Sequence, residues 1–512
     1  MQKLLFGLPI ITSILLWISY HPADQSWAIW VALVPFLAYI KIENNKFRLF
    51  VFSWLCGFIF FILGLWWISV VSYPGLFIVS FILAFYFLLF GLFTKAIYIR
   101  FGETLFYLCA PLLWVFLEMA RAYLLTGFPW LFLAHTQYQW KTFIQISDIT
   151  GAYGISFLIA SINVYITFVL SRAFTKHIPK RKNRLQVVMW GSILVGLMVL
   201  SIIYGYCRVK SFKSEIGPKI GIVQSNIEQS LKLKGDRSKE IYLKHFNLSL
   251  ELLKNNPDLI IWAETMFPYL VKAESGTTDF LGETALACQT DMIIGAVSDD
   301  NPSMKLSKLY NSAYLISSEG IIIGRYDKKH LVPVSEFLPM RKVFPFLEKT
   351  ALKLSELKRL PLLNHGEKPG ILKWKNYRIG LLICYESIFP EMSRRLAMDE
   401  ADFIINLSND GWFKNSAELE QILIISLFRA VENKITFVRA TNTGISAIIS
   451  PLGLIEPLKN VNGAIKEVEG TLAEKIHISK KKTIYGKYGD YFPFICLLSI
   501  AIIILIKIIK LI

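Results

Sequence analysis

Three residues that together could perform nucleophilic chemistry stand at the ends of apolar, strand-like runs. Glu264 closes "DLIIWAE", Lys328 follows "IIIGRYD", and Cys384 closes "GLLIC". A thiol attacks as the thiolate, so it needs a base that takes its proton and positive charge nearby. Glu264 is suited to be that base, and Lys328 is suited to stabilise the thiolate and later an oxyanion.

Each of these residues also has an ordinary structural explanation. A single cysteine is more often inert core filler, and a glutamate or lysine at a strand end is usually a solvated rim residue. The six cysteines form no C-x-x-C pair, which predicts neither a disulfide framework nor a zinc site and leaves the redox state of Cys207 and Cys288 open. The sequence has no H-E-x-x-H, G-x-G-x-x-G or P-loop motif, so we expect no metal and no cofactor.

The elements that must position these residues alternate between strands and helices. Short β-branched runs begin at residue 219 and include "KIGIVQSN", "DMIIGAVS", "YRIGLLICYE", "DFIINLSND" and "KITFVRATN". Segments with helical spacing separate them at 237–254, 278–289 and 416–433, and two hairpins interrupt the alternation, "NSAYLISSEGIIIGRYDKK" and "GISAIISPLG". This pattern predicts a layered α/β domain.

The rest of the chain is too apolar for a soluble protein. Of 512 residues, 54% are hydrophobic and 14% aromatic, and the mean hydropathy is +0.47. A helix of roughly 20 apolar residues spans a bilayer while satisfying its own backbone hydrogen bonds. Eight stretches qualify, near residues 4–20, 27–41, 49–72, 75–94, 104–124, 152–171, 187–206 and 491–511.

The loops between these spans predict an orientation. Basic loops follow the second, fourth and sixth spans, whereas the alternate loops carry few cations, which places both termini in the cytoplasm. Residues 1–206 would then form the bundle, 207–490 a domain on the outer face, and 491–512 the last helix. We attribute the net charge of +17 to inward loops and to a domain lying against anionic lipid, because the basic residues show no nucleic-acid motif.

The motifs resemble a known superfamily. The stretches W-A-E-T, Y-D-K-K-H-L-V-P-V-S-E-F-L-P and L-L-I-C-Y-E, in that order, are similar to the Glu-Lys-Cys motifs of the nitrilase, or carbon-nitrogen hydrolase, superfamily. The apolar spans and "GFPWLFLAHTQ" at 127–137 narrow the resemblance to the apolipoprotein N-acyltransferases of bacterial inner membranes. It implies an eight-helix transmembrane bundle and a nitrilase-like αββα sandwich on the periplasmic side.

The resemblance also implies roles for particular residues. It makes Glu264, Lys328 and Cys384 the catalytic triad, with Lys328 preferred to its neighbour Lys329 because the family's lysine precedes a second glutamate, here Glu336, by eight positions. The remaining residues that match functional positions of the family are Tyr385, Glu386 and Trp412. One departure is Leu233 in "QSNIEQSLKL", where the family usually has tryptophan.

The implied reaction is a two-step acyl transfer. Family members take an acyl chain from a phospholipid, typically phosphatidylethanolamine, onto the cysteine as a thioester. They then pass it to the N-terminal amine of a diacylglyceryl-cysteine lipoprotein, the last step of lipoprotein maturation. One site serving both half-reactions predicts ping-pong kinetics. We expect the chain to act as a monomer, without nucleic acid.

Two other functions compete with this one. A membrane-tethered amidase or nitrilase would hydrolyse its acyl-enzyme with water, and the triad does not exclude it, although a site closed by lipid favours transfer. An eight-span transporter or scaffold would typically show repeated halves, and the sequence shows no internal repeat.

Two further features have a functional and a structural interpretation. The loop "EFLPMRKVFPFLEK" at 336–349 is apolar enough to be a lid that dips into the outer leaflet, or else ordinary core. Glu118 and Arg121 lie one helical turn apart in the fifth span. We expect them to pair with each other at the interface rather than to bind lipid headgroups.

Overall fold

The chain divides into two compact units. In the computed structural model, the described residues are 5–174, 180–232, 237–272, 276–300, 308–337 and 363–509. The first unit comprises Met1–Ser69, Tyr73–Phe212 and Lys487–Ile512, and the second comprises Lys213–Gly486 with the short segment Val70–Ser72. The second unit is therefore an insertion into the chain of the first.

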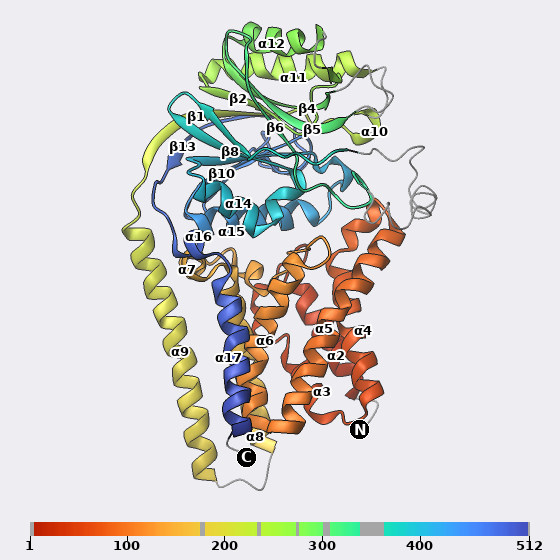
Figure 1. The fold of residues 1–512 in the computed structure, drawn as a ribbon, viewed down its shortest axis with the longest axis vertical. Coiled ribbons are helices and arrows are strands. Elements are labelled where there is room, and N and C mark those ends of the chain that lie inside the picture. Colours follow the sequence, from red (N-terminus) through yellow and green to blue (C-terminus); the bar gives the residue numbers. More distant parts are fainter. Residues whose placement is uncertain are drawn as a thin grey trace. The chain divides into compact units, whose positions relative to one another are not determined.

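The first unit, which we call the helical unit, consists of apolar helices (Figure 1). Six helices of its described part are long and apolar enough to cross a membrane. They are α4 (Lys46–Gly64), α5 (Tyr73–Phe101), α6 (Glu103–Tyr123), α8 (Ala152–Phe174), α9 (Lys180–Lys210) and α17 (Tyr491–Ile509). Within their apolar windows, α6 is 78% buried and α9 only 6%, so α6 belongs to the core of the unit and α9 to its surface.

The first two expected spans are shorter helices. Helix α2 covers Gly7–Ile18, and the second expected span is divided into η1 (Ser26–Trp30) and α3 (Val34–Ile42). Pro35 stands in the first turn of α3. Proline is tolerated there because that N–H has no helical partner, but it cannot continue a helix that arrives from before it. The chain is thus a membrane protein with six helices of spanning length among the described residues.

Glu118 and Arg121 do not form an ion pair with each other in the described structure, which corrects the expectation above. A carboxylate oxygen of Glu118 accepts hydrogen bonds from the backbone N–H of Leu133 at 2.9 Å and from the indole of Trp114 at 3.1 Å. The Arg121 guanidinium donates to the carbonyl of Trp130 at 2.5 Å. Both side chains therefore hold the buried, non-helical stretch after α6 in place, where backbone groups need partners.

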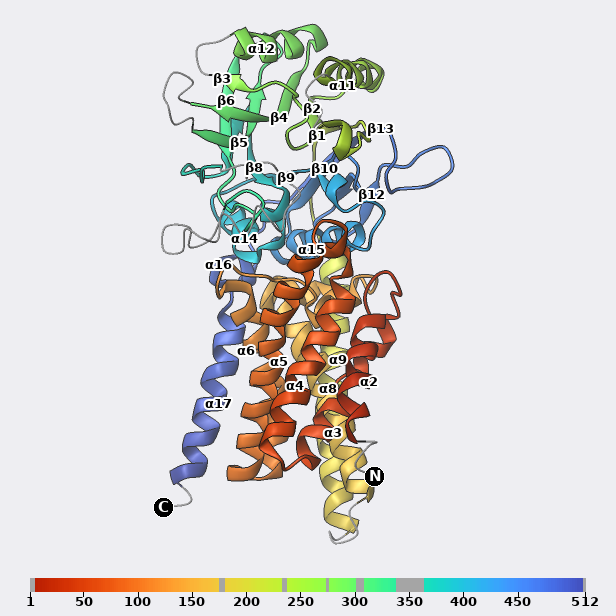
Figure 2. The same ribbon diagram turned by 90° about the vertical axis from the view of Figure 1, so that its right-hand side faces the viewer.

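The second unit, which we call the α/β unit, contains two sheets between two layers of helices, as Figures 1 and 2 show. The first sheet has the order β13-β1-β2-β4-β5-β6, with β3 on β4, and the second has β12-β11-β10-β9-β8-β7. The strands of the first sheet are β1 (Glu215–Gln224), β2 (Leu259–Trp262), β3 (Val271–Lys272), β4 (Asp291–Asp299), β5 (Leu309–Ile316), β6 (Ile322–Asp327) and β13 (Gly470–Ile478). Those of the second are β7 (Ile371–Trp374), β8 (Tyr377–Ile383), β9 (Phe403–Ser408), β10 (Thr436–Thr441), β11 (Ala447–Ile449) and β12 (Ile455–Pro457).

Successive side chains of the central strands point to opposite faces, which explains why each sheet is covered by apolar residues on both sides. In β2, Leu259 and Ile261 pack into the core between the two sheets, whereas Ile260 and Trp262 pack into a second core against the helices. Because successive side chains of a strand point to opposite faces, a strand covered on both sides reads as a continuous apolar run. The outer helices are α11 (Ser238–Leu252) and α12 (Gly276–Cys288) on the first sheet, and α14 (Pro390–Met398) and α15 (Glu418–Asn433) on the second. The predicted αββα sandwich is confirmed.

Candidate active site

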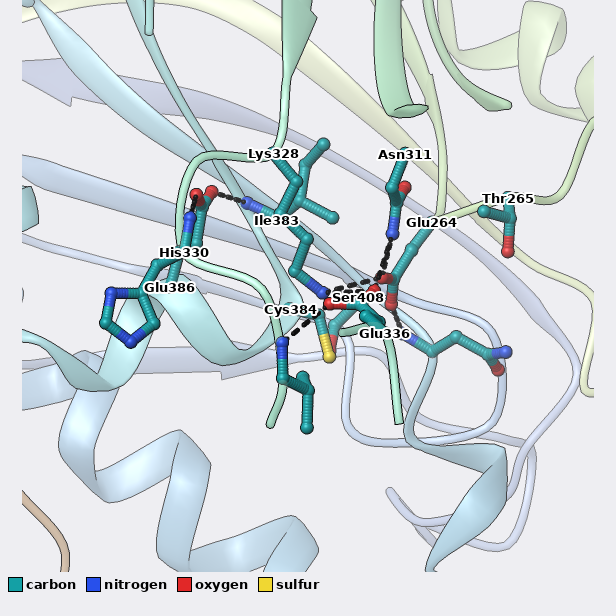
Figure 3. A network of polar contacts seen from close by, with 12 residues as sticks. Glu264, Thr265, Asn311, Lys328, His330, Glu336, Ile383, Cys384, Glu386 and Ser408 are labelled. Atoms are coloured by element: carbon teal, nitrogen blue, oxygen red, sulfur yellow. Dashed lines mark hydrogen bonds and ion pairs between the residues drawn. The ribbon is translucent and has the colours of Figure 1, made fainter. Parts of the chain in front are cut away.

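The three residues predicted to do chemistry lie at strand ends. Glu264 comes two residues after β2, while Lys328 directly follows β6 and Cys384 directly follows β8. Strand β5 is antiparallel to both β4 and β6, so β6 runs in the same direction as β2, and their carboxyl ends share one edge of the first sheet. Figure 3 shows the three side chains gathered at one point. The structure therefore brings all three together.

A buried ammonium between two carboxylates forms the centre of the site. Nζ of Lys328 lies 3.2 Å from Oε1 of Glu264 and 2.9 Å from Oε1 of Glu336. The second oxygen of Glu336 accepts from the N–H of Val332 at 2.8 Å. Burial alone would lower the pKa of Lys328, but the two carboxylates outweigh it and hold the pKa well above its usual range. Lys328 is consequently always charged.

Two asparagines that the sequence analysis missed hold the Glu264 carboxylate. Asn311, in β5, donates to Oε1 of Glu264 at 2.7 Å and to Glu336 at 3.2 Å. The backbone N–H of Asn409, just after β9, donates to Oε2 of Glu264 at 2.9 Å. Because Oε1 also accepts from Lys328, both oxygens are oriented by hydrogen bonds, and the carboxylate has a fixed direction.

Cys384 is the first residue of the short helix η7 (Cys384–Ile388), at the sharp turn that follows β8. Its φ is +53°, a left-handed conformation that is unfavourable for a side chain with a Cβ and that is typical of functional sites. Its carbonyl accepts from Ser387 at 3.0 Å and Asn406 at 3.2 Å, which hold the turn. Cys384 is partly exposed, as a nucleophile must be.

The resting thiol carries its proton. Burial raises the pKa of Cys384 well above its ordinary value, and the negative charge of Glu264 raises it further, against the opposing effect of Lys328. A preformed thiolate is therefore disfavoured. An attack by this sulfur would need a base that takes its proton, and the Glu264 carboxylate is near enough to influence the thiol.

Glu386 lies behind the site and connects two of its strands. One oxygen accepts from the backbone N–H groups of Lys329 at 2.7 Å and His330 at 2.9 Å, and the other from that of Ile383 at 2.7 Å. The hydroxyl of Tyr326 donates to both at 2.9 Å. The side chain is fully buried, and burial raises its pKa. Glu386 therefore joins the residues after Lys328 to the residue before Cys384.

The other predicted residues lie around this centre. The ring of Tyr385 packs against those of His330 and Phe389, with centroids 5.9 and 5.1 Å apart. Trp412, in η8 (Asp410–Trp412), is 38% exposed and lies on the loop after β9. Leu233 and residues 338–349 of the expected lid lie outside the described residues.

Lys232 is a second lysine at the site that the sequence analysis missed. It ends the short helix α10 (Gln229–Lys232), and its ammonium donates to the hydroxyl of Thr265 and to the carbonyl of Glu264, the latter at 3.4 Å. Its charge interacts with both Glu264 and Cys384. The only available signal was its position in the stretch "QSNIEQSLKL", next to Leu233.

Two family models match the chain, one mainly in each unit. Residues 12–165 match the apolipoprotein N-acyltransferase N-terminal domain, and residues 219–459 match the carbon-nitrogen hydrolase family. The apolipoprotein N-acyltransferase of Geobacter metallireducens is 35% identical over 77% of this chain and 72% of its own. That of Rickettsia prowazekii is 32% identical over 92% of both chains.

The chain also aligns with solved structures. A carbon-nitrogen hydrolase from Helicobacter pylori is 18% identical and aligns with a TM-score of 0.36 over 51% of this chain and 89% of its own.

The α/β unit thus places the protein in the carbon-nitrogen hydrolase class, here with apolar helices of membrane-spanning length in the same chain. Within that class, the chain belongs to the apolipoprotein N-acyltransferase family.

Proposed function

We propose that this protein moves an acyl chain from a phospholipid, such as phosphatidylethanolamine, to the N-terminal amine of a diacylglyceryl-cysteine lipoprotein. The names of relatives that match most of the chain support acyl transfer over hydrolysis. The observation that carries the mechanism is the Glu264–Lys328–Glu336 ion triplet next to Cys384, at 3.2 and 2.9 Å.

In the first half-reaction, Glu264 takes the thiol proton as the sulfur of Cys384 attacks the donor ester carbonyl. The oxyanion that forms faces the ammonium of Lys328. When the intermediate collapses, the ester C–O bond breaks, and Glu264 returns the proton to the leaving alkoxide. The products are a thioester on Cys384 and a lysophospholipid.

In the second half-reaction, the neutral lipoprotein amine attacks the same carbonyl. An α-amino group has a pKa of roughly 7.7 to 8.0, so a sizeable fraction is neutral near pH 7. Glu264 accepts a proton from the attacking nitrogen, the C–S bond breaks, and the proton returns to the thiolate. The amide leaves, and Cys384 is again a thiol.

Glu336 and Glu386 support this chemistry without reacting. Glu336 keeps Lys328 charged and in place, and Glu386 fixes the spacing between the lysine and cysteine strands. Tyr385 and Trp412 would line the substrate path. We further propose that the protein crosses the inner membrane eight times as a monomer, with the α/β unit in the periplasm, which the distribution of basic loops supports.

The test is a labelled phospholipid given to membranes that contain the protein. We expect an adduct on the protein that hydroxylamine releases, followed by labelled lipoprotein. Cys384→Ala should abolish both, whereas Cys207→Ala, at an exposed cysteine, should retain both. An adduct that persists in Cys384→Ala would refute the nucleophile. Free fatty acid as the main product would instead identify a hydrolase.

A further inference from the structure

The charges at the centre of the site do not balance. Glu264 and Glu336 both bind Lys328, so two carboxylates share one ammonium in an environment where all three side chains are largely buried. During the reaction the sulfur and then the carbonyl oxygen also become negative. Each added negative charge in a poorly solvated site raises the free energy unless a cation compensates it. Lys328 already pairs with two carboxylates, so its single positive charge is not enough to neutralise the additional negative charge.

Lys232 is the cation that can restore the balance. Within the described part of the chain, its ammonium donates to two uncharged groups, the hydroxyl of Thr265 and the carbonyl of Glu264, and forms no ion pair. Its charge interacts with Glu264, which follows β2, with Cys384, which follows β8, and with His245 on α11. The site then contains two ammonium groups and two carboxylates around one thiol.

The same lysine holds the backbone next to Glu264. Thr265 has a φ of +53°, a left-handed conformation that a β-branched residue rarely adopts without support from its surroundings. The bond from Lys232 to its hydroxyl provides such support. On the other side, Gln229 of the same helix accepts from the amide of Asn409 at 2.8 Å, and the backbone N–H of Asn409 binds Glu264. Helix α10 therefore fixes Glu264 from two directions.

We propose that Lys232 is a positioning residue and the second ammonium of the active site, which holds the Glu264–Thr265 turn and stabilises the negative charge that develops on Cys384 and on the carbonyl oxygen. This role rests on the proposed function. Burial lowers the pKa of Lys232 to about 8, against the raising effect of Glu264 and Cys384. The ammonium is consequently present at neutral pH and is lost as the pH rises above about 8.

The experiment compares Lys232→Met and Lys232→Arg with the unchanged protein, all as full-length chains in membranes. Lys239→Met, at an exposed lysine on α11, serves as the control. One readout is the rate of the hydroxylamine-sensitive adduct from labelled phospholipid. The other is the pH dependence of Cys384 alkylation by iodoacetamide, followed by mass spectrometry of the peptide. Alkylation needs no lipid, so it tests the role of Lys232 even if the proposed acyl donor is wrong.

For Lys232→Met we expect adduct formation to slow about tenfold or more, and the rate of Cys384 alkylation below about pH 8, where Lys232 is charged, to fall about tenfold, the effect of losing one nearby positive charge. Lys232→Arg and Lys239→Met should stay within about threefold of the unchanged protein. Adduct formation by the unchanged protein should decline above about pH 8, and Lys232→Arg, which keeps its charge, should show no such decline.

An unchanged alkylation rate below about pH 8 together with an unchanged adduct rate in Lys232→Met would overturn the proposal. If Lys232→Met does not fold, the Lys232→Arg profile decides, because a decline above pH 8 that persists in that variant would equally contradict a role for the Lys232 charge.

Discussion

Glu386 illustrates how a fully buried carboxylate can determine the geometry of the site. Three backbone N–H groups and the Tyr326 hydroxyl all donate to it, and these donors come from the segments that carry Lys328 and Cys384. A group that only accepts hydrogen bonds is required there. Glutamine has the same shape, but its amide nitrogen is a donor and would face other donors.

We therefore expect Glu386→Gln to lose both stability and activity. At least one buried N–H would be left without an acceptor, which costs about 1–3 kcal/mol. Because the spacing of Lys328 and Cys384 would relax, the rate of adduct formation should fall by about a hundredfold, the effect expected of a displacement of about 1 Å. Denaturant unfolding and the adduct rate measure the two effects.

Glu391→Gln is the matched control, since Glu391 on α14 forms a surface ion pair with Arg395. Such pairs contribute about 0–1 kcal/mol, so this variant should unfold and react like the unchanged protein. Equal behaviour of the two variants would show that Glu386 has no special role.

At this scale the sequence predicted the residues at strand ends and, through the family resemblance, Glu336 as the partner of Lys328, but not the asparagines that hold Glu264. Glu264 and Cys384 each end an apolar run, which makes them visible in the sequence, whereas Lys328 stands in the polar stretch "RYDKKH" and was selected by its spacing from Glu336. Asn311 lies within strand β5, and Asn409 binds Glu264 through its backbone N–H. The sequence alone therefore does not indicate either contact. Their contacts arise only when strands far apart in the chain are brought to one edge of the fold.

Among the elements, α11 carries a buried histidine that leads back to the site. His245 is fully buried, and its ring contacts the carbonyl of Ile241 and the hydroxyl of Ser225, both at 2.9 Å. That hydroxyl donates to Asn442 at 3.2 Å, and Asn442 in turn donates to Asn409 at 3.0 Å. Helix α11 and the ends of β1, β9 and β10 are thereby joined in one polar network.

Because His245 is buried, we expect acid to destabilise the α/β unit. Burial lowers the pKa of His245 to about 4, whereas in the unfolded chain it is about 6.5. Between these values the unfolded state binds a proton that the folded state does not, so folding becomes less favourable as the pH falls from about 6.5 to about 4. The loss attributable to His245 is on the order of 3 kcal/mol.

Denaturant unfolding of the detergent-solubilised protein across this pH range checks that expectation. In His245→Gln, which cannot titrate, the free energy of unfolding should depend less steeply on pH. His477→Gln, at an exposed position on β13, should retain the full dependence. Parallel slopes for the unchanged protein and His245→Gln would exclude this source of acid sensitivity.

The central strands were predictable, whereas the edge strands β7 and β13 were not. The runs that became β1, β2, β4, β8, β9 and β10 are apolar because both faces of their sheets are covered. Strand β13 reads "GTLAEKIHI" and is largely exposed along its middle, so its polar residues conceal a strand that pairs with β1 over nearly its whole length. Only the pairing with a strand some 250 positions earlier reveals it, since strand pairing depends on tertiary context more than on local preference.

For the whole molecule, the helical unit depends on polar contacts inside an apolar bundle. Glu118 accepts from the N–H of Leu133 and from Trp114, and Arg121 donates to the carbonyl of Trp130. In surroundings without water each of these backbone groups would be costly if left without a partner. The expected pairing of Glu118 with Arg121 was wrong because the buried stretch after α6 competes for both side chains.

A pair of substitutions at Glu118 tests this role. Glu118→Ala removes the acceptor for two donors and should destabilise the protein by about 1–3 kcal/mol. Glu118→Gln keeps the oxygen that accepts both bonds and should unfold close to the unchanged protein. Thermal unfolding in detergent measures the difference. If the glutamine variant were as unstable as the alanine variant, the negative charge itself, rather than the acceptor oxygen, would be the important property.

The register of β1 against β13 has a practical consequence for the architecture. Glu215 pairs with Ile478, so the chain enters and leaves the α/β unit at adjacent positions on one edge of the first sheet. The two ends of the inserted unit are consequently close together. A short linker could join them to make a circular chain, or the unit could be inserted into a loop of an unrelated soluble protein, without distorting either sheet.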